Sequence, residues 1–278
     1  MSGLFFVYCL PRPGEMKNVQ IATWNVNSIK TRLELLLRWL DEAKPDLVCL
    51  QEIKCVDEAF PRAEIEAAGY NVAVHGQKSY NGVAILSRHP LEDVHVRLGG
   101  DEQDEHARFI EAVVSTEAGV VRLGGLYLPN GNPADTPKYG YKLAWMERLR
   151  AHAAERLAHE EIFVLAGDFN VIPAAEDAKR PAAWVNDALF LPETRAAWRR
   201  LLALGMTDAV RACDDAAGLF TFWDYQAGAW QKNDGIRIDH LLLSPQAADR
   251  LVGVRIDKHV RAWERPSDHV PVVAELAL

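Results

Sequence analysis

Short apolar runs alternate with polar, turn-forming segments along most of the chain. Runs rich in β-branched and aromatic residues, bounded by Gly, Pro, Asn or Asp, are typical of strands that are buried on at least one face. This pattern predicts strands at 19–25, 47–50, 70–74, 82–87, 109–115, 120–128, 162–166, 238–243, 252–257 and 270–276.

Helical spacing of apolar residues occurs in two further stretches. Leucines at 33, 36, 37 and 40 predict a helix from Ser28, as N-cap, to about Ala43. A second helix is predicted from about Tyr141 to Leu157, and residues 174–218 alternate between irregular and helical patterns. The first fifty residues therefore predict a β-α-β unit, which is typical of a chain that mixes helices and strands in α/β layers.

Polar side chains follow several of the predicted strands. Gly167 lets the backbone turn after the apolar run 162–166, and Asp168 and Asn170 come next. On an extended backbone these two side chains share a face, although they are also typical of an ordinary Asp/Asn turn. Other polar groups at strand ends are Asn25, Glu52, Tyr127, Asp239, Asp268 and His269. Neighbouring strands would gather these groups at one edge of a sheet.

A cluster of carboxylates repels itself unless a cation lies among them. Oxygen ligands without a Cys pair favour Mg²⁺ or Mn²⁺ over zinc. A histidine next to an aspartate, together with a metal ion, is the equipment for hydrolysis by water. The sequence therefore predicts a metal-dependent hydrolase.

Composition narrows the class of protein. The chain has 278 residues, of which 49% are hydrophobic and 25% charged, as in soluble globular proteins. Without a linker-like segment, residues 16–278 are expected to form one domain, preceded by a disordered extension at 1–15. The net charge of −8 does not indicate nucleic acid, but a local basic rim would be hidden in that sum.

The cellular setting follows from the cysteines and the apolar runs. Four cysteines without a Cys-x-x-Cys pair suggest a reducing, cytoplasmic setting. No apolar run reaches the ~18 residues that a transmembrane helix needs, so we expect no membrane association.

Six motifs occur in an order that resembles one known family. They are Thr23-Trp-Asn-Val-Asn27, Leu50-Gln-Glu-Ile-Lys54, Tyr127-Leu-Pro-Asn-Gly131, Gly167-Asp-Phe-Asn170, Arg237-Ile-Asp-His-Leu241 and Pro266-Ser-Asp-His269. From Met16 onward the sequence resembles the exonuclease III group of apurinic/apyrimidinic endonucleases, in the endonuclease/exonuclease/phosphatase superfamily. The resemblance implies a four-layer α/β sandwich of two packed mixed sheets with helices outside, similar to deoxyribonuclease I.

The resemblance also implies roles for the polar residues. Asp168 would position or deprotonate the attacking water, Tyr127 would assist the phosphate or the leaving group, and Asp239 would hold His269 charged against the phosphate. The residues implied at the metal are Asn25, Glu52, Asp168, Asn170, Asp268 and His269. Asp268 would either support the metal ligands without contacting the metal ion, or bind a second metal ion. Whether Asp168 or the His269–Asp239 pair is the base, and whether one metal or two are bound, stays open.

Other residues are expected to contact the substrate. They are Asn130, Asn170, Lys54, Asn81, Arg108, Phe222 and Trp223, of which one of the two aromatic residues would line the DNA groove or hold a sugar without a base. Relatives often carry Gln where this chain has Asn130, which gives the same carboxamide a shorter reach.

The resemblance implies a Mg²⁺-dependent (or Mn²⁺-dependent) nuclease of base excision repair. It would act as a monomer on double-stranded DNA, cutting 5′ to abasic sites or removing 3′ nucleotides and 3′ blocking groups. One alternative is a phosphatase of the same fold that acts on inositol phosphates or lipid head groups. Another is a binding module without activity, which the full set of polar residues argues against.

Overall fold

The computed structural model describes residues 17–278. The extension predicted at residues 1–15, and Met16 as the start of the domain, lie outside the described residues. Among the described residues, no helix is both long enough and apolar enough to cross a membrane.

Two six-stranded mixed sheets form the centre of the molecule. The first has the order β11-β12-β1-β2-β4-β3 and the second β5-β6-β7-β8-β10-β9. The first sheet consists of β1 (Asn18–Asn25), β2 (Leu47–Gln51), β3 (Asn71–His75), β4 (Val83–Ser87), β11 (Leu251–Ile256) and β12 (Val272–Ala277). The second consists of β5 (Leu91–Val96), β6 (Phe109–Ser115), β7 (Val120–Tyr127), β8 (Phe163–Asp168), β9 (Thr207–Asp208) and β10 (Asp239–Leu243).

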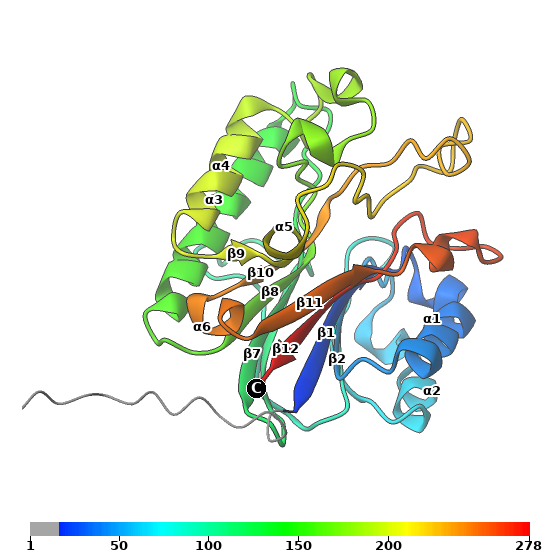
Figure 1. Cartoon of the computed structure of the whole chain (residues 1–278), viewed down its shortest axis with the longest axis vertical. Helices are drawn as coiled ribbons and strands as arrows, with labels where there is room; N and C mark the ends of the chain where they lie inside the picture. Colours follow the sequence, from blue (N-terminus) through cyan, green and yellow to red (C-terminus); the bar gives the residue numbers. More distant parts are fainter. Residues whose placement is uncertain (1–16) are drawn as a thin grey trace, which may run out of the picture.

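Helices cover the outer face of each sheet. Helices α1 (Ile29–Ala43) and α2 (Arg62–Ala67) lie on the first sheet, and α3 (Pro137–Leu157) and α4 (Pro192–Leu202) lie on the second (Figure 1). Shorter helices are α5 (Ala209–Cys213), α6 (Pro245–Ala248) and the 3₁₀ turns at Asp57–Ala59, Ala175–Asp177, Pro181–Trp184 and Lys258–Ala262. The predicted four-layer α/β sandwich is confirmed.

All ten predicted strands are present, with shifts at their ends. Strand β5 was not predicted because it lies at a sheet edge and most of its side chains are exposed, so it lacks an apolar run. Helix α1 matches its prediction, but the Ser28 side chain makes no capping hydrogen bond to the helix and instead pairs with Thr31. Helix α3 begins earlier than predicted, at Pro137, which suits the first turn because its missing N–H needs no partner there.

Alternation along the strands produces the layers. On β8, Val164 and Ala166 face the first sheet, whereas Phe163 and Leu165 face the helices α3 and α4. On β10, Leu241 and Leu243 likewise face the first sheet. The core between the sheets is therefore built from every second residue of each central strand.

Candidate active site

The polar residues lie where the core between the sheets ends. Asp168 continues the alternation of Val164 and Ala166, and Asp239 continues that of Leu241 and Leu243, so both carboxylates belong to the inward-facing set. The same alternation that fills the core with methyl groups thus ends in charged groups at the edge of the sandwich.

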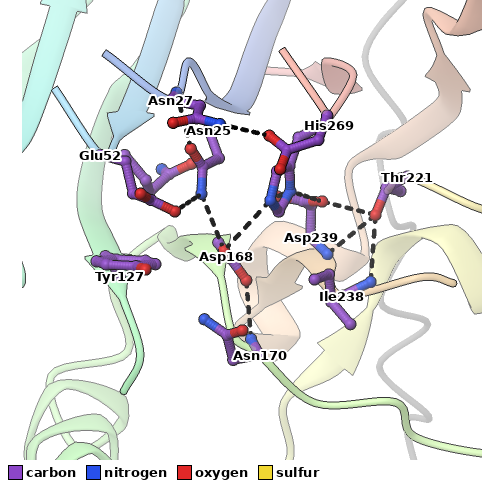
Figure 2. A network of polar contacts seen from close by, with 12 residues as sticks. Asn25, Asn27, Glu52, Tyr127, Asp168, Asn170, Thr221, Ile238, Asp239 and His269 are labelled. Carbon is purple, nitrogen blue, oxygen red and sulfur yellow. Dashed lines mark hydrogen bonds and ion pairs between the residues drawn. The ribbon is translucent and has the colours of Figure 1, made fainter. Parts of the chain in front are cut away.

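Strand register brings the side chains of the second sheet together. Asp168 pairs with Tyr127 on one side and with Asp239 on the other. In the first sheet Asn25 pairs with Gln51, which places Glu52 one residue beyond. The prediction that strand-end groups gather at one edge is confirmed for these residues, and Figure 2 shows them around Asp168.

Asn25 joins the two sheets as a hydrogen-bond donor. Its Nδ2 lies 2.9 Å from Oε1 of Glu52 and 3.0 Å from Oδ2 of Asp168. Its Oδ1 accepts from the backbone N–H of Asn27 at 3.0 Å, which fixes the orientation of the amide. The amide thus presents nitrogen to both carboxylates in this arrangement, and a metal contact by Asn25 stays a prediction.

Glu52, Asp168 and His269 each offer a ligand atom, and these atoms lie within 4.8 Å of one another. The carboxylate oxygens of Glu52 and Asp168 suit a hard divalent cation. Burial raises the pKa of Glu52, but the ammonium of Lys54, 2.8 Å from Oε2, and the Asn25 amide hold the pKa below its ordinary value. The carboxylate of Glu52 is therefore ionised and ready to bind metal.

His269 lies between two carboxylates. Its Nδ1 is 2.9 Å from Oδ2 of Asp239, and its Nε2 is 3.8 Å from Oδ2 of Asp168. Burial lowers the pKa of His269, but these carboxylates more than offset it and raise the pKa to about 10. A protonated imidazole has no free lone pair, so this geometry favours the predicted phosphate contact over the predicted metal ligation.

Thr221 was missed by the sequence analysis. Its hydroxyl donates to Oδ2 of Asp239 at 2.6 Å and accepts from the N–H groups of Ile238 and Asp239, each at 3.2 Å. It thereby fixes the carboxylate that holds His269 (Figure 2). The signal was a small polar residue between two phenylalanines in the segment 220–225.

Asp168 is buried among charged groups. Burial raises its pKa to about 7, with Asp239 adding to the rise and His269 opposing it. A divalent cation beside this carboxylate would lower the pKa again. Without a cation beside it, Asp168 can therefore take up a proton near neutral pH.

Tyr127 completes this side of the site. Burial, followed by the negative charges of Glu52 and Asp168, raises the pKa of Tyr127 well above its ordinary value, so the phenol stays protonated. The guanidinium of Arg108 lies 4.9 Å from the centre of the Tyr127 ring and donates to the Tyr127 backbone oxygen at 3.2 Å. The phenol is therefore a neutral hydrogen-bond donor.

Asn130 and Asn170 form a pair beside Asp168. Nδ2 of Asn130 lies 3.1 Å from Oδ1 of Asn170, whose Nδ2 donates to the backbone oxygen of Leu128 at 2.9 Å. The backbone here is a turn rather than extended, because Asn170 has φ of 48° and its N–H turns back to Oδ1 of Asp168 at 2.9 Å. This is the Asx turn that the sequence left open. A metal contact by Asn170 stays a prediction.

Asp268 lies outside the group formed by Glu52, Asp168 and His269. Its Oδ1 accepts from Nδ2 of Asn27 at 3.0 Å, and Oδ1 of Asn27 accepts from Lys54 at 2.6 Å. Asn27 was given no role from the sequence, yet it links Asp268 to the Lys54–Glu52 ion pair. This position behind the ligands agrees with one of the two predicted roles of Asp268.

Some of the side chains predicted to contact the substrate are buried, and others are accessible to solvent. Trp223 is fully buried and its Nε1 donates to Asn233, so the predicted DNA contact is wrong. Asn81 is 7% exposed and its carboxamide donates to Gln77, which also argues against a phosphate contact. Phe222 is the accessible aromatic residue, and its ring centre lies 4.9 Å from that of His269.

A cleft of about 400 Å³ opens beside Phe222. Its lining includes Trp184, Phe222, Gln226 and Ile236, with the exposed ion pair between Arg180 and Asp234 at its wall. Clefts of this size hold small organic groups. Lys54, Arg108 and Asn130 stay predicted contacts with the substrate.

Comparison with known proteins agrees with this geometry. Residues 22–269 match the model of the endonuclease/exonuclease/phosphatase family. The chain belongs to this family. It is 33% identical to exodeoxyribonuclease III of Haemophilus influenzae, over 92% of this chain and 99% of that protein. The present chain therefore also belongs to the exonuclease III group, as its motifs predicted. It is a hydrolytic enzyme.

Two solved structures extend the likeness to the whole fold. One is a 3′ phosphatase from Neisseria bound to a product DNA hairpin, 38% identical with a TM-score of 0.90. The other is an AP endonuclease from Archaeoglobus fulgidus, 37% identical with a TM-score of 0.89. Each match covers 94% of this chain and 100% of the other.

Proposed function

We propose that this protein is a DNA repair nuclease that hydrolyses phosphodiesters in double-stranded DNA, acting as a monomer with Mg²⁺ or Mn²⁺. The observation that carries the proposal is the meeting of Glu52, Asp168 and the His269–Asp239 pair at the end of the core between the sheets. The enzyme would hydrolyse the phosphodiester bond 5′ to an abasic site, and the bonds that attach 3′ nucleotides or 3′ blocking groups.

Glu52 and Asp168 would hold the metal ion, since their oxygens suit Mg²⁺ and Mn²⁺ alike. When bound, the metal ion supplies positive charge that offsets the charge of the phosphodiester. Protein side chains would transfer the proton, offset the charge on the phosphate and donate a hydrogen bond to the phosphate or to the leaving oxygen.

Asp168 accepts a proton from the attacking water, since it is a buried carboxylate that lies between Asn25 and His269 at the centre of the site. The water oxygen forms the new bond to phosphorus as the bond from phosphorus to the 3′ oxygen breaks. The His269 imidazolium, held by Asp239, offsets the charge that builds on the phosphate oxygens. Tyr127 donates a hydrogen bond to the phosphate or to the departing 3′ oxygen, which takes a proton from water and becomes the 3′ hydroxyl.

The cleft beside Phe222 supports selectivity of the enzyme for an abasic nucleotide. A sugar without a base can enter the space of about 400 Å³ beside Phe222, whose ring contacts that of His269, whereas a paired nucleotide stays stacked in the duplex. Insertion of an aromatic or apolar side chain at the minor groove favours this exposure.

The test uses a labelled duplex with one tetrahydrofuran abasic analogue, a second duplex with a recessed 3′ end and a third with a 3′ phosphate, each with Mg²⁺. We expect incision 5′ to the analogue or 3′ processing by the wild-type protein, lost with EDTA and in His269→Ala. His259→Ala is the matched control, because His259 is an exposed histidine beside Glu42. Phosphate release from inositol phosphates without action on any duplex would overturn the proposal.

A further inference from the structure

We propose that Lys142 is a positioning residue that sets the Asn130–Asn170 pair of the site through their backbone carbonyls. This inference rests on the proposed function for its kinetic consequence. Its structural consequence can be measured without activity.

Lys142 lies on α3 and is fully buried, although it carries an ionisable group. Its Nζ donates to the backbone oxygen of Asn130 at 3.0 Å and to that of Asn170 at 2.5 Å. These two residues are forty positions apart, at the ends of β7 and β8. One ammonium group therefore ties together the two loops that leave the central strands of the second sheet.

Geometry explains why these carbonyls need a partner. Asn170 has φ of 48°, a left-handed backbone conformation that is strained for a residue with a side chain. Its side chain accepts from Asn130 and its N–H bonds to Asp168. The hydrogen bond from Lys142 to the backbone oxygen of Asn170 holds the peptide in this conformation. It thereby keeps the Asn170 side chain where it accepts from Asn130.

Close packing holds the loop after Asn130 against the stem of Lys142. A Cβ added to Gly131 would lie 2.7 Å from Cδ of Lys142 and 3.2 Å from Cβ of Ala188. Gly131 has φ of 89°, so the loop after Asn130 passes over the lysine stem as only glycine permits.

Two hydrogen bonds do not require a charged amine. Burial lowers the pKa of Lys142 to about 7, while Asp168 and Asp187 oppose the fall. A neutral amine still carries two N–H groups, one for each carbonyl. The positioning role therefore holds in both protonation forms.

The kinetic test compares Lys142→Met, which removes both donors and keeps an unbranched stem, with Lys142→Gln, which keeps two N–H donors on a shorter arm. We expect kcat of Lys142→Met on the abasic duplex to fall about 10- to 100-fold, the loss that corresponds to leaving buried polar groups unpaired. KM should change less than kcat, and Lys142→Gln should recover part of kcat.

Arg122→Met is the matched control for loss of a buried cation. Arg122 lies near the start of β7, at the opposite end from Tyr127, and binds Glu111, Asp93 and Glu161. We expect this variant to lose stability and keep kcat. The same loss of kcat in Arg122→Met at an equal loss of stability would overturn the positioning role.

A double-mutant comparison tests whether Lys142 affects kcat through Asn170. Lys142→Met should add little to the kcat loss of Asn170→Ala, because the lysine acts through that residue. Losses that multiply in full would overturn the proposal, and so would a folded Lys142→Met with unchanged kcat. The same comparison with Lys142→Gln serves if the methionine variant does not fold.

NMR of the side-chain amides separates this inference from the proposed function. In Lys142→Met we expect the signals of Asn130 and Asn170 to shift or broaden, while that of Asn71, on β3, stays in place. Unchanged Asn130 and Asn170 signals would overturn the inference whatever the enzyme cuts. A wild-type protein that cuts no DNA but shows the expected shifts would overturn only the proposed function.

Discussion

His269 and Asp239 belong to segments that lead into different sheets, yet Nδ1 of the imidazole lies 2.9 Å from Oδ2 of the carboxylate. The pair is buried, and Thr221 holds the carboxylate from the other side. Contact across the two sheets thus fixes the ring that faces Asp168.

Replacement of Asp239 by Asn removes the charge that stabilises the imidazolium. We expect kcat on the abasic duplex to fall about 100-fold or more, within the range of groups that assist charge and proton transfer. Asp93→Asn is a suitable control, since Asp93 forms an exposed pair with His95 at 2.8 Å. Equal kcat values for Asp239→Asn and wild type would show that the pair has no part in the reaction.

Lys54 competes with any cation for Glu52, because its Nζ lies 2.8 Å from Oε2. We expect Lys54→Met to bind Mn²⁺ about fivefold more tightly in the absence of DNA, equivalent to ~1 kcal/mol for a partly exposed ion pair. The KM for DNA should rise in the same variant, because a contact with phosphate is lost. Calorimetry and kinetics measure the two effects, with the exposed Lys30→Met as control; weaker metal binding would contradict the argument.

The neutral phenol of Tyr127 contributes one hydrogen bond. Tyr127→Phe should lower kcat about tenfold with little change in KM, as expected for a bond made to developing charge. Because the pKa of Tyr127 lies well above 10, the wild-type enzyme should show no loss of this contribution up to that pH. Tyr139→Phe, which removes a hydroxyl 3.0 Å from that of Thr194, should leave kcat unchanged. A rise in KM alone would instead assign Tyr127 to substrate binding.

Acid stability should depend on His240, which is buried and accepts a hydrogen bond from Arg237 on Nδ1. Burial, with Arg237 as the next cause, lowers the pKa of His240 from 6.5 to about 4. Between these values the unfolded chain binds the proton and the folded chain does not. Stability is therefore lost as pH falls from 6.5 to about 4.

The corresponding free energy is roughly 3 kcal/mol at the acid end of that window. Urea unfolding of wild type and His240→Gln between pH 7 and pH 4 measures it. The variant should lack this part of the pH dependence. Parallel curves for the two proteins would mean that His240 is protonated in the folded state as readily as in the unfolded one.

Much of the fold could be predicted because apolar alternation is strong in the central strands. Asp168 and Asp239 were found for the same reason, since each lies within two residues of an apolar run. Strand β5 could not be found, because an edge strand needs no apolar face.

Errors in the site arose where contacts between distant segments decide a side chain's role. Trp223 is turned into the core by its packing against Trp230, with ring centres 5.0 Å apart. Lys142 has an ordinary sequence context, and its importance arises only from two carbonyls that the fold brings to it.

The place of β12 between β11 and β1 has a consequence for the newly made protein. A ribosome releases the chain from its N-terminus, so Asn25, Glu52 and Asp168 emerge well before His269. Until β12 enters between β11 and β1, His269 does not meet Asp239 and Asp168. We therefore expect the site to become complete only after the segment that carries His269 has folded into the first sheet.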